Sequence, residues 1–365
     1  MSKEIRRHIG QLIIAGFSGC TIPEELRALA RELDLGGIIL FGRNVEAPEQ
    51  VAELAHAAQG LARDLPLWVS VDQEGGRVAR LRSPFTLWPP MQTLGRSGDD
   101  KLAGAFAQAL ARELRAVGVT LDYAPVLDVQ TNARNPVIGD RALSGRADVV
   151  ARLGATIIDA LQGEGVAACG KHFPGHGDTD RDSHHELPVV GHSPERLREI
   201  ELEPFRAAIA REVAAIMTAH VLYPAIDDEQ PATLSRQIIT GLLREDLGFD
   251  GLIATDDMEM AAVSERHSVE DGTVRAVAAG CDMVLLCGTD VGRQVAALEA
   301  LIRAVEEERL PAKRVEDALA RQAKTKARFL GHVREWRPPT SKALQEVLGC
   351  DRHVSIAEEM ERYVS

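Results

Sequence analysis

The sequence predicts an α/β fold, a single-domain (β/α)8 barrel of the TIM type with a short C-terminal helical extension. Eight short apolar runs rich in β-branched residues recur between residues 12 and 287, and amphipathic helical patterns lie between most of them. Strands that are apolar on both faces and alternate with helices form parallel sheets. Eight such units match a (β/α)8 barrel, whose typical size is roughly 250 residues.

The predicted strands and helices follow one another in a regular order. The helical patterns are clearest at 49–65 and 148–165. A doubly wound open sheet is the competing fold, but the first strand is not followed by the GxGxxG pattern with which such sheets bind dinucleotides. The eight predicted strands cover 12–17, 36–41, 67–72, 119–125, 165–172, 214–220, 251–257 and 281–287.

Two connections, 73–118 and 172–213, are longer than the others. Long loops in a compact domain usually carry function. After the last strand, two helices are expected near 291–308 and 314–330, and the segment Arg-Pro-Pro-Thr at 337–340 then interrupts the helical pattern. We therefore expect a barrel domain followed by a C-terminal tail or helix, with the bounds 1–335 and 336–365.

Composition excludes several classes of protein. The formal net charge is −13, whereas binding to nucleic acid requires a basic surface. No apolar run reaches the roughly 18 residues of a membrane span, and the first apolar run is too short for a signal peptide. The five cysteines are odd in number and scattered, which favours a reducing compartment. We expect a cytoplasmic monomer.

Polar residues stand at the ends of several predicted strands, where a barrel carries its catalytic groups. A strand that is buried on both faces ends in charged side chains only where they have a use or a partner. Because all the strand ends of a barrel meet at one mouth, these residues predict an active site there. They are Asp72–Arg77, Asp128, Lys171, His172, His220, Asp256 and Asp257.

The richest stretch is KHFPGHGDTDRDSHHELP at 171–188, which combines glycines with many titratable groups. Its four histidines and several aspartates are the ligand types of a zinc site. Alternatively, Asp182 and His184 form an acid/base pair in which the carboxylate fixes the tautomer of the imidazole. A third interpretation, a solvated polar loop, is disfavoured by the expected convergence with Asp256.

This loop, together with IATDDMEM at 253–260, resembles family 3 of the glycoside hydrolases. Within that family the likeness is to bacterial β-N-acetylglucosaminidases of the peptidoglycan-recycling (NagZ) type, and it covers residues 8–330. Further matching blocks are GGIILFGRN at 36–44, VDQEGGRVARL at 71–81, APVLDV at 124–129, NPVIGDRALS at 135–144, TAHVLYPAID at 218–227 and PATLS at 231–235.

The resemblance implies a retaining exo-β-N-acetylglucosaminidase that removes terminal N-acetylglucosamine from peptidoglycan (muropeptide) fragments through a covalent glycosyl-aspartate. The implied partner is a small carbohydrate, such as an N-acetylglucosaminyl-anhydromuramyl peptide, and no metal or organic cofactor is implied. A phosphorylase or a β-glucosidase of the same family remains an alternative activity. A non-catalytic module that binds sugar or zinc is the alternative from another class.

Asp256 matches the nucleophile of the family, and a carboxylate at a strand end can attack an anomeric carbon. Asp257 is its rival, but strand alternation points only one of the pair into the mouth. The small Ala254, two residues earlier, suits an inward position. We expect Asp257 to be structural and salt-bridged beneath the site.

His184 matches the family's acid/base, with Asp182 as its partner. An imidazole with a pKa of about 6.5 can donate and accept a proton near neutral pH. The adjacent His185 is assigned to the surface, and His176 is expected to order the loop through a hydrogen bond.

The resemblance assigns a further set of residues to the sugar ring. Their charged groups suit hydroxyls, which both donate and accept hydrogen bonds. Asp128 and His220 are expected to orient Lys171 or His172, and Arg141 is expected to pair with Asp140 or Asp128 as well. The predicted sugar-binding residues are Asp72, Arg80, Arg141, Lys171 and His172.

Overall fold

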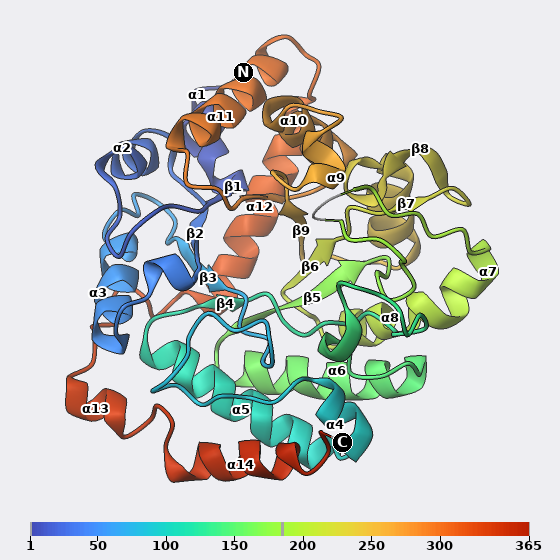
Figure 1. The fold of residues 1–365 in the computed structure, drawn as a ribbon. Coiled ribbons are helices and arrows are strands. Elements are labelled where there is room, and N and C mark those ends of the chain that lie inside the picture. Colours follow the sequence, from blue (N-terminus) through green and yellow to red (C-terminus); the bar gives the residue numbers. More distant parts are fainter. Residues whose placement is uncertain (1, 184–185, 365) are drawn as a thin grey trace.

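Eight parallel strands close into a barrel in the computed structural model, which describes residues 2–183 and 186–364 (Figure 1). Hydrogen bonds join the strands in the order β1, β2, β3, β4, β5, β6, β9, β10 and back to β1. All eight predicted strands are confirmed, and with them the barrel fold. They are β1 (Ile13–Ala15), β2 (Gly37–Leu40), β3 (Trp68–Val71), β4 (Leu121–Asp122), β5 (Ala167–Phe173), β6 (Ala215–Thr218), β9 (Leu252–Asp257) and β10 (Met283–Leu286).

Helices surround the barrel and fill the long connections. The 73–118 connection contains α4 and α5, and the 172–213 connection contains α7 and α8. The helices are α1 (Lys3–His8), α2 (Glu24–Leu33), α3 (Pro48–Gln59), α4 (Gln92–Ser97), α5 (Asp100–Ala116), α6 (Ala147–Gly163), α7 (Pro194–Arg196), α8 (Glu203–Ala210), α9 (Ala261–Ser264), α10 (Val269–Ala279), α11 (Val291–Glu306), α12 (Ala312–Phe329), α13 (Ser341–Gln345) and α14 (Asp351–Glu361). No helix within 2–183 and 186–364 has the length and apolar character that crossing a bilayer demands.

Side chains of each strand alternate between two apolar cores. The inner core fills the barrel and includes Trp68, Cys169 and Ala254, whereas Ile38 and Val69 belong to the outer core between strands and helices. Ala254 faces the inner core, but the pairing of β9 with β10 shifts between Ala254 and Asp257. Strand alternation alone therefore does not place Asp256; the charged groups that act on it are His220, His172 and Lys171.

An antiparallel hairpin, β7 (Leu222–Tyr223) and β8 (Asp227–Pro231), follows β6 and was not predicted. β7 is apolar and Tyr223 is buried, whereas β8 is mostly polar. The turn between them is closed by the Ile226 N–H, which donates to the Tyr223 carbonyl at 2.9 Å, and Asp227 forms a second, local turn at the start of β8. Asp227 Oδ1 accepts the backbone N–H groups of Glu229 (3.1 Å) and Gln230 (3.0 Å), and Oδ2 accepts the Ser235 hydroxyl (2.6 Å). Asp and Asn close turns in this way.

The C-terminal extension, residues 336–364, is helical. It begins at Trp336 near α3, and α13 and α14 follow. In Figure 1, α14 runs along the outer side of α5 and brings the C-terminus beside α4. The extension therefore covers one flank of the barrel instead of trailing from it.

Candidate active site

Charged side chains from different strand ends form one network at the barrel mouth. Lys171 Nζ lies 2.8 Å from Asp72 Oδ1 and 2.7 Å from Glu74 Oε1. Arg141 donates two hydrogen bonds to Glu74, of 2.9 and 2.8 Å, and Arg80 Nη2 lies 3.3 Å from Asp72 Oδ2. The structure thus brings four predicted sugar-binding residues together around Glu74, to which the sequence assigned no role.

Arg141 is paired differently from the expectation. Its bidentate partner is Glu74, and the predicted pairing with Asp140 or Asp128 is wrong, because Asp140 pairs with Arg77 (3.2 Å) and Asp128 accepts from other groups. A fork of two parallel N–H groups matches a carboxylate and fixes its orientation.

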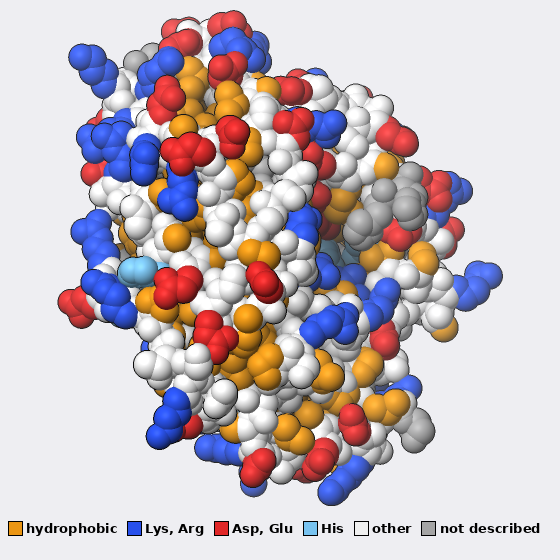
Figure 2. All heavy atoms as spheres, turned by 60° about the vertical axis from the view of Figure 1, so that its left-hand side comes forward, with side chains coloured by type: hydrophobic (Ala, Val, Ile, Leu, Met, Phe, Trp, Pro, Cys, Tyr) orange, Lys and Arg blue, Asp and Glu red, His pale blue; other side chains and the backbone are white. Residues whose placement is uncertain are grey.

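The network remains charged although it is buried. Burial by itself would raise the pKa of Glu74, but Arg141 and Lys171 outweigh it and hold the pKa well below its usual range. Burial would lower the pKa of Lys171, but Asp72 and Glu74 raise it above the ordinary value. The network therefore contains three cationic side chains (Lys171, Arg141 and Arg80) and two carboxylates (Asp72 and Glu74). Figure 2 shows Lys and Arg side chains gathered around a hollow with histidine at its floor.

Asp256 is the next-to-last residue of β9, and its carboxylate is held in its ionised form. Burial alone would raise its pKa, but His220, His172, the backbone N–H of Asp257 and Lys171 together lower it below the usual value. The Asp257 N–H donates to Asp256 Oδ1 at 2.8 Å. Opposite charges and hydrogen bonds to the charged form both favour a carboxylate.

Asp257 differs from its neighbour, and the predicted salt bridge is wrong. Among the ion pairs of the described residues none involves Asp257; its Oδ1 instead accepts the backbone N–H groups of Cys287 and Glu259, each at 3.1 Å. Burial raises the pKa of Asp257 to about 6. This carboxylate therefore ties β9 to β10.

Asp128 and His220 were both predicted to orient Lys171 or His172, and in the structure they have different partners. Asp128 Oδ2 lies 2.7 Å from His172 Nδ1, so Asp128 orients His172 as expected. His220 has a different place, because its ring nitrogens lie 2.7 Å from Thr233 Oγ1 and 2.9 Å from the backbone carbonyl oxygen of Asp257. His220 thus braces the end of β9 and contributes to the low pKa of Asp256.

The histidine-rich loop is ordered from within by His176. Its Nδ1 lies 2.8 Å from Thr179 Oγ1 and its Nε2 3.1 Å from Ser183 Oγ, as expected for a loop-ordering residue. Burial and the nearby His172 lower the pKa of His176 to about 4, so the ring is neutral and can donate with one nitrogen and accept with the other. Because both ring nitrogens are hydrogen-bonded, His176 has no nitrogen free to bind a zinc ion.

The end of this loop approaches β9. The backbone carbonyl of Ser183 accepts the N–H of Ala262, in the helix that follows Asp256, at 3.3 Å. Asp182 is partly buried, and its carbonyl accepts the N–H of Glu186 at 3.0 Å. The predicted acid/base His184 and the adjacent His185 lie outside the described residues.

Sequence reasoning placed Glu74 at the mouth without giving it a role of its own, and it missed a second buried carboxyl group, that of Asp122. Glu74 stands two residues after Asp72, and a comparison of same-face positions on the strand end was the signal available for it. Asp122 ends β4, where its Oδ1 accepts the N–H of Gln73 at 2.9 Å, and burial raises its pKa well above the usual value. Asp122 therefore ionises less readily than an exposed aspartate would.

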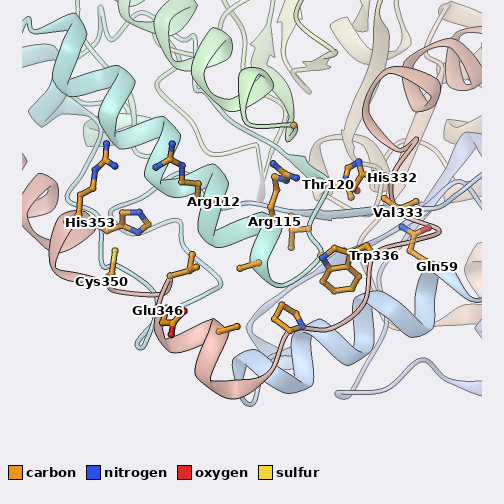
Figure 3. A pocket seen from close by; sticks show the side chains of 18 residues that line it. Gln59, Arg112, Arg115, Thr120, His332, Val333, Trp336, Glu346, Cys350 and His353 are labelled. Atoms are coloured by element: carbon orange, nitrogen blue, oxygen red, sulfur yellow. The ribbon is translucent and has the colours of Figure 1, made fainter.

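A cavity of about 560 Å³ lies at the opposite end of the barrel. It is bordered by Gln59, Arg115, Thr120 and Gly165, which precede strands or end helices, and by Trp336 of the extension (Figure 3). No described member of the predicted site lines it. A (β/α)8 barrel carries its chemistry at the other end, so this cavity is not the candidate active site.

Comparisons with known proteins agree with this geometry. The family described as "Glycosyl hydrolase family 3 N terminal domain" matches residues 4–324. Beta-hexosaminidase of Nitrosomonas eutropha is 41% identical over 285 residues, which cover 76% of this chain and 81% of that protein. Beta-hexosaminidase A of Pseudoalteromonas piscicida is 37% identical over 334 residues, or 85% of this chain, and the match spans 56% of that longer relative.

Solved structures resemble the whole chain. A glycoside hydrolase family 3 beta-N-acetylglucosaminidase from Paenibacillus sp. str. FPU-7 aligns with a TM-score of 0.94 and 44% identity, over 100% of this chain and 69% of that one. NagZ from Neisseria gonorrhoeae, in complex with N-trifluoroacetyl-D-glucosamine, aligns with a TM-score of 0.78 and 31% identity, over 97% and 98% of the two chains. The chain belongs to glycosyl hydrolase family 3 and is a glycoside hydrolase.

Proposed function

We propose that the chain is a retaining exo-β-N-acetylglucosaminidase that removes terminal N-acetylglucosamine from peptidoglycan (muropeptide) fragments. The observation that carries this proposal is an ionised Asp256 at a strand end of the mouth that also holds Asp72, Lys171 and Arg141. The names of the relatives, beta-hexosaminidase and beta-N-acetylglucosaminidase, support the substrate class.

The proposed reaction has two steps. His184, positioned by Asp182, protonates the glycosidic oxygen as that oxygen leaves with the bonding electron pair, while Asp256 attacks the anomeric carbon and forms a covalent ester. His184 then takes a proton from water, which attacks the same carbon and releases Asp256 as a carboxylate with net retention. The contact between Ser183 and Ala262 supports an approach of the histidine loop to β9.

The charged network is proposed to hold the sugar ring. Arg80 Nε is buried and has no hydrogen-bond partner in 2–183 and 186–364, so a sugar hydroxyl is a suitable acceptor for it. Lys171, Asp72 and Arg141 are fixed by one another and by Glu74, which reduces the entropy lost when they bind a substrate. His172, oriented by Asp128, offers its second ring nitrogen to the ring. The proposed course requires no metal or organic cofactor.

Hydrolysis of a chromogenic aryl N-acetyl-β-glucosaminide tests the proposal. Asp256→Ala is expected to lower kcat by a factor on the order of 10⁴ or more, because no group remains to form the intermediate. His184→Ala is expected to slow substrates with poor leaving groups by roughly 10²–10⁴ and activated aryl substrates much less, because a good leaving group needs little protonation.

Control measurements separate the alternatives. Asp257→Asn should retain far more activity than Asp256→Ala, and the reverse order contradicts the assignment. Formation of a sugar 1-phosphate when phosphate is supplied would establish a phosphorylase, and preference for an aryl β-glucoside would establish a β-glucosidase.

The setting of the activity is also a proposal. All five cysteines are free thiols, which agrees with a reducing cytoplasm where cell-wall fragments are recycled. N-acetylglucosaminyl-anhydromuramyl peptides are the proposed natural substrates, and release of N-acetylglucosamine from them, measured against chitobiose, tests the specificity. A monomeric state remains a prediction, which light scattering can check.

A further inference from the structure

One buried carboxylate on α5 joins two segments that lie far apart in the sequence. Glu113, whose side chain is 2% exposed, accepts four hydrogen bonds. Two come from Thr86, through its N–H (3.0 Å) and its hydroxyl (2.6 Å). The other two come from the C-terminal extension, through the Gly349 N–H (2.9 Å) and His353 Nδ1 (2.9 Å).

Thr86 belongs to the loop that carries a predicted sugar-binding residue. Gln73 holds the first part of this loop, because its Oε1 accepts the N–H groups of Arg80 (2.8 Å) and Leu81 (3.0 Å) and its amide donates to the Leu81 carbonyl (2.8 Å). The side chain of Arg80 then reaches Asp72 at the mouth. The anchored Thr86 therefore lies six residues from Arg80, at the other end of the same packed segment.

The extension also touches this loop directly. A Cβ added to Gly349, whose φ is +56°, would lie 2.4 Å from the carbonyl oxygen of Pro84, so only glycine permits this approach. At the end of the extension, Arg96 of α4 donates to the carbonyl of Tyr363 at 3.1 Å. Figure 3 shows His353 on the extension next to α5, where it lines the cavity described above.

We propose that the C-terminal extension positions Arg80 for sugar binding, with Glu113 as the joint between His353 and Gly349 on one side and the Thr86 segment on the other. His353 and Glu113 are positioning residues that act through the loop. This inference rests on the proposed function, since Arg80 counts as a sugar-binding residue only there. It goes beyond that function by giving the extension a part in substrate affinity.

The physical basis is the cost of leaving a buried carboxylate short of donors. Four donors satisfy Glu113, whose side chain is almost fully buried. When one donor is removed, the buried oxygen loses a charge-assisted hydrogen bond, and the segments around it rearrange to replace it. Because Thr86 supplies two of the remaining donors, the loop shifts and Arg80 moves with it.

The test compares His353→Ala with a matched control, His8→Ala. His8 also pairs with a carboxylate, Asp34, at 2.8 Å and joins the first helix, α1, to the end of α2, away from the 73–88 loop. With the chromogenic N-acetylglucosaminide, His353→Ala is expected to raise KM about three- to tenfold while kcat stays within about twofold, because a displaced Arg80 weakens binding of ground and transition states alike. His8→Ala is expected to lower thermal stability without changing KM.

Two further variants show whether the effect passes through the loop. Thr86→Val removes the hydroxyl donor from the loop side and is expected to reproduce the KM change. In an Arg80→Ala background, His353→Ala is expected to add little to KM, because two residues that act through one interaction are not additive. Full additivity would overturn the proposal.

Hydrogen exchange of the 73–88 segment supplies a readout that does not depend on activity. Exchange is expected to quicken in His353→Ala and to stay unchanged in His8→Ala. If the wild type hydrolyses no N-acetylglucosaminide, the proposed function fails. Hydrogen exchange of the 73–88 segment would still test whether Glu113 couples the extension to that segment. Unchanged KM and unchanged exchange in folded His353→Ala and Thr86→Val would overturn this coupling, and Thr86→Val alone decides if His353→Ala does not fold.

Discussion

The pKa values of Asp256 and Asp257 are shifted in opposite directions because the two side chains have different surroundings. Imidazoles and Lys171 favour the ionised form of Asp256, and its pKa is lowered. Burial raises the pKa of Asp257 to about 6, although the backbone N–H groups of Cys287 and Glu259 act in the opposite direction. Neighbouring carboxylates whose environments push their pKa values apart are a recurrent feature of active sites, and the pair supports Asp256 as the nucleophile.

Glu74 gives the sharpest prediction at the scale of a single residue. Glu74→Gln leaves the buried cations of Lys171 and Arg141 without their shared carboxylate, and breaking a buried ion pair costs about 3–5 kcal/mol. Guanidinium denaturation should show a loss of this size. The control Glu299→Gln removes an exposed partner of Arg303 and should cost no more than about 1 kcal/mol. Equal losses in the two variants contradict the network described here.

At the scale of elements, α12 closes the end of the barrel opposite the mouth through a buried lysine. Lys326 Nζ donates to Gln11 Oε1 (2.5 Å) and to the carbonyl of Gly36 (2.8 Å), and it lies 6.0 Å from the centre of the Trp68 ring. Burial lowers the pKa of Lys326 to about 7. The amine of Lys326 on α12 therefore contacts the segments that lead into β1 and β2 and the first residue of β3.

This lysine makes stability depend on pH in a defined direction. Its folded pKa lies below the unfolded value of about 10.4, so the unfolded chain binds more protons between pH 7 and about 10, and the free energy of unfolding rises with pH there. Lys326→Met should remove a slope of up to about 1.4 kcal/mol per pH unit. Denaturation at several pH values measures it, with the exposed Lys324→Met as control; a slope unchanged by Lys326→Met contradicts the assignment.

For the whole molecule, the sequence predicted the barrel better than the contacts across its mouth. The strands were predictable because both faces of each are buried, so their pattern is local. Arg141 and Glu74 are 67 positions apart and His353 and Glu113 are 240 apart, and no local pattern reports which side chains meet after closure. The pairing of Asp128 with His172 was predicted because both stand at strand ends, whereas His220 turned toward β9.

Different parts of the barrel carry the candidate active site and the contacts that hold the fold together. The strand ends at the mouth gather Asp256 and the charged network, while α12 closes the floor and the extension covers α5. In (β/α)8 barrels generally, the loops at the mouth carry the chemistry and the opposite end contributes stability. The proposed mechanism requires the carboxylate of Asp256 to bond covalently to the sugar.

Trapping of the glycosyl-enzyme tests whether this bond to Asp256 forms. In a 5-fluoro N-acetyl-β-glucosaminyl fluoride, fluoride leaves without help from an acid, and the ring fluorine slows release of the glycosyl-enzyme. Peptide mass spectrometry is predicted to find one fluorinated N-acetylglucosaminyl group, attached to Asp256, retained in Asp257→Asn and missing in Asp256→Ala. An adduct on another residue, or hydrolysis that proceeds with inversion and no adduct, contradicts the account.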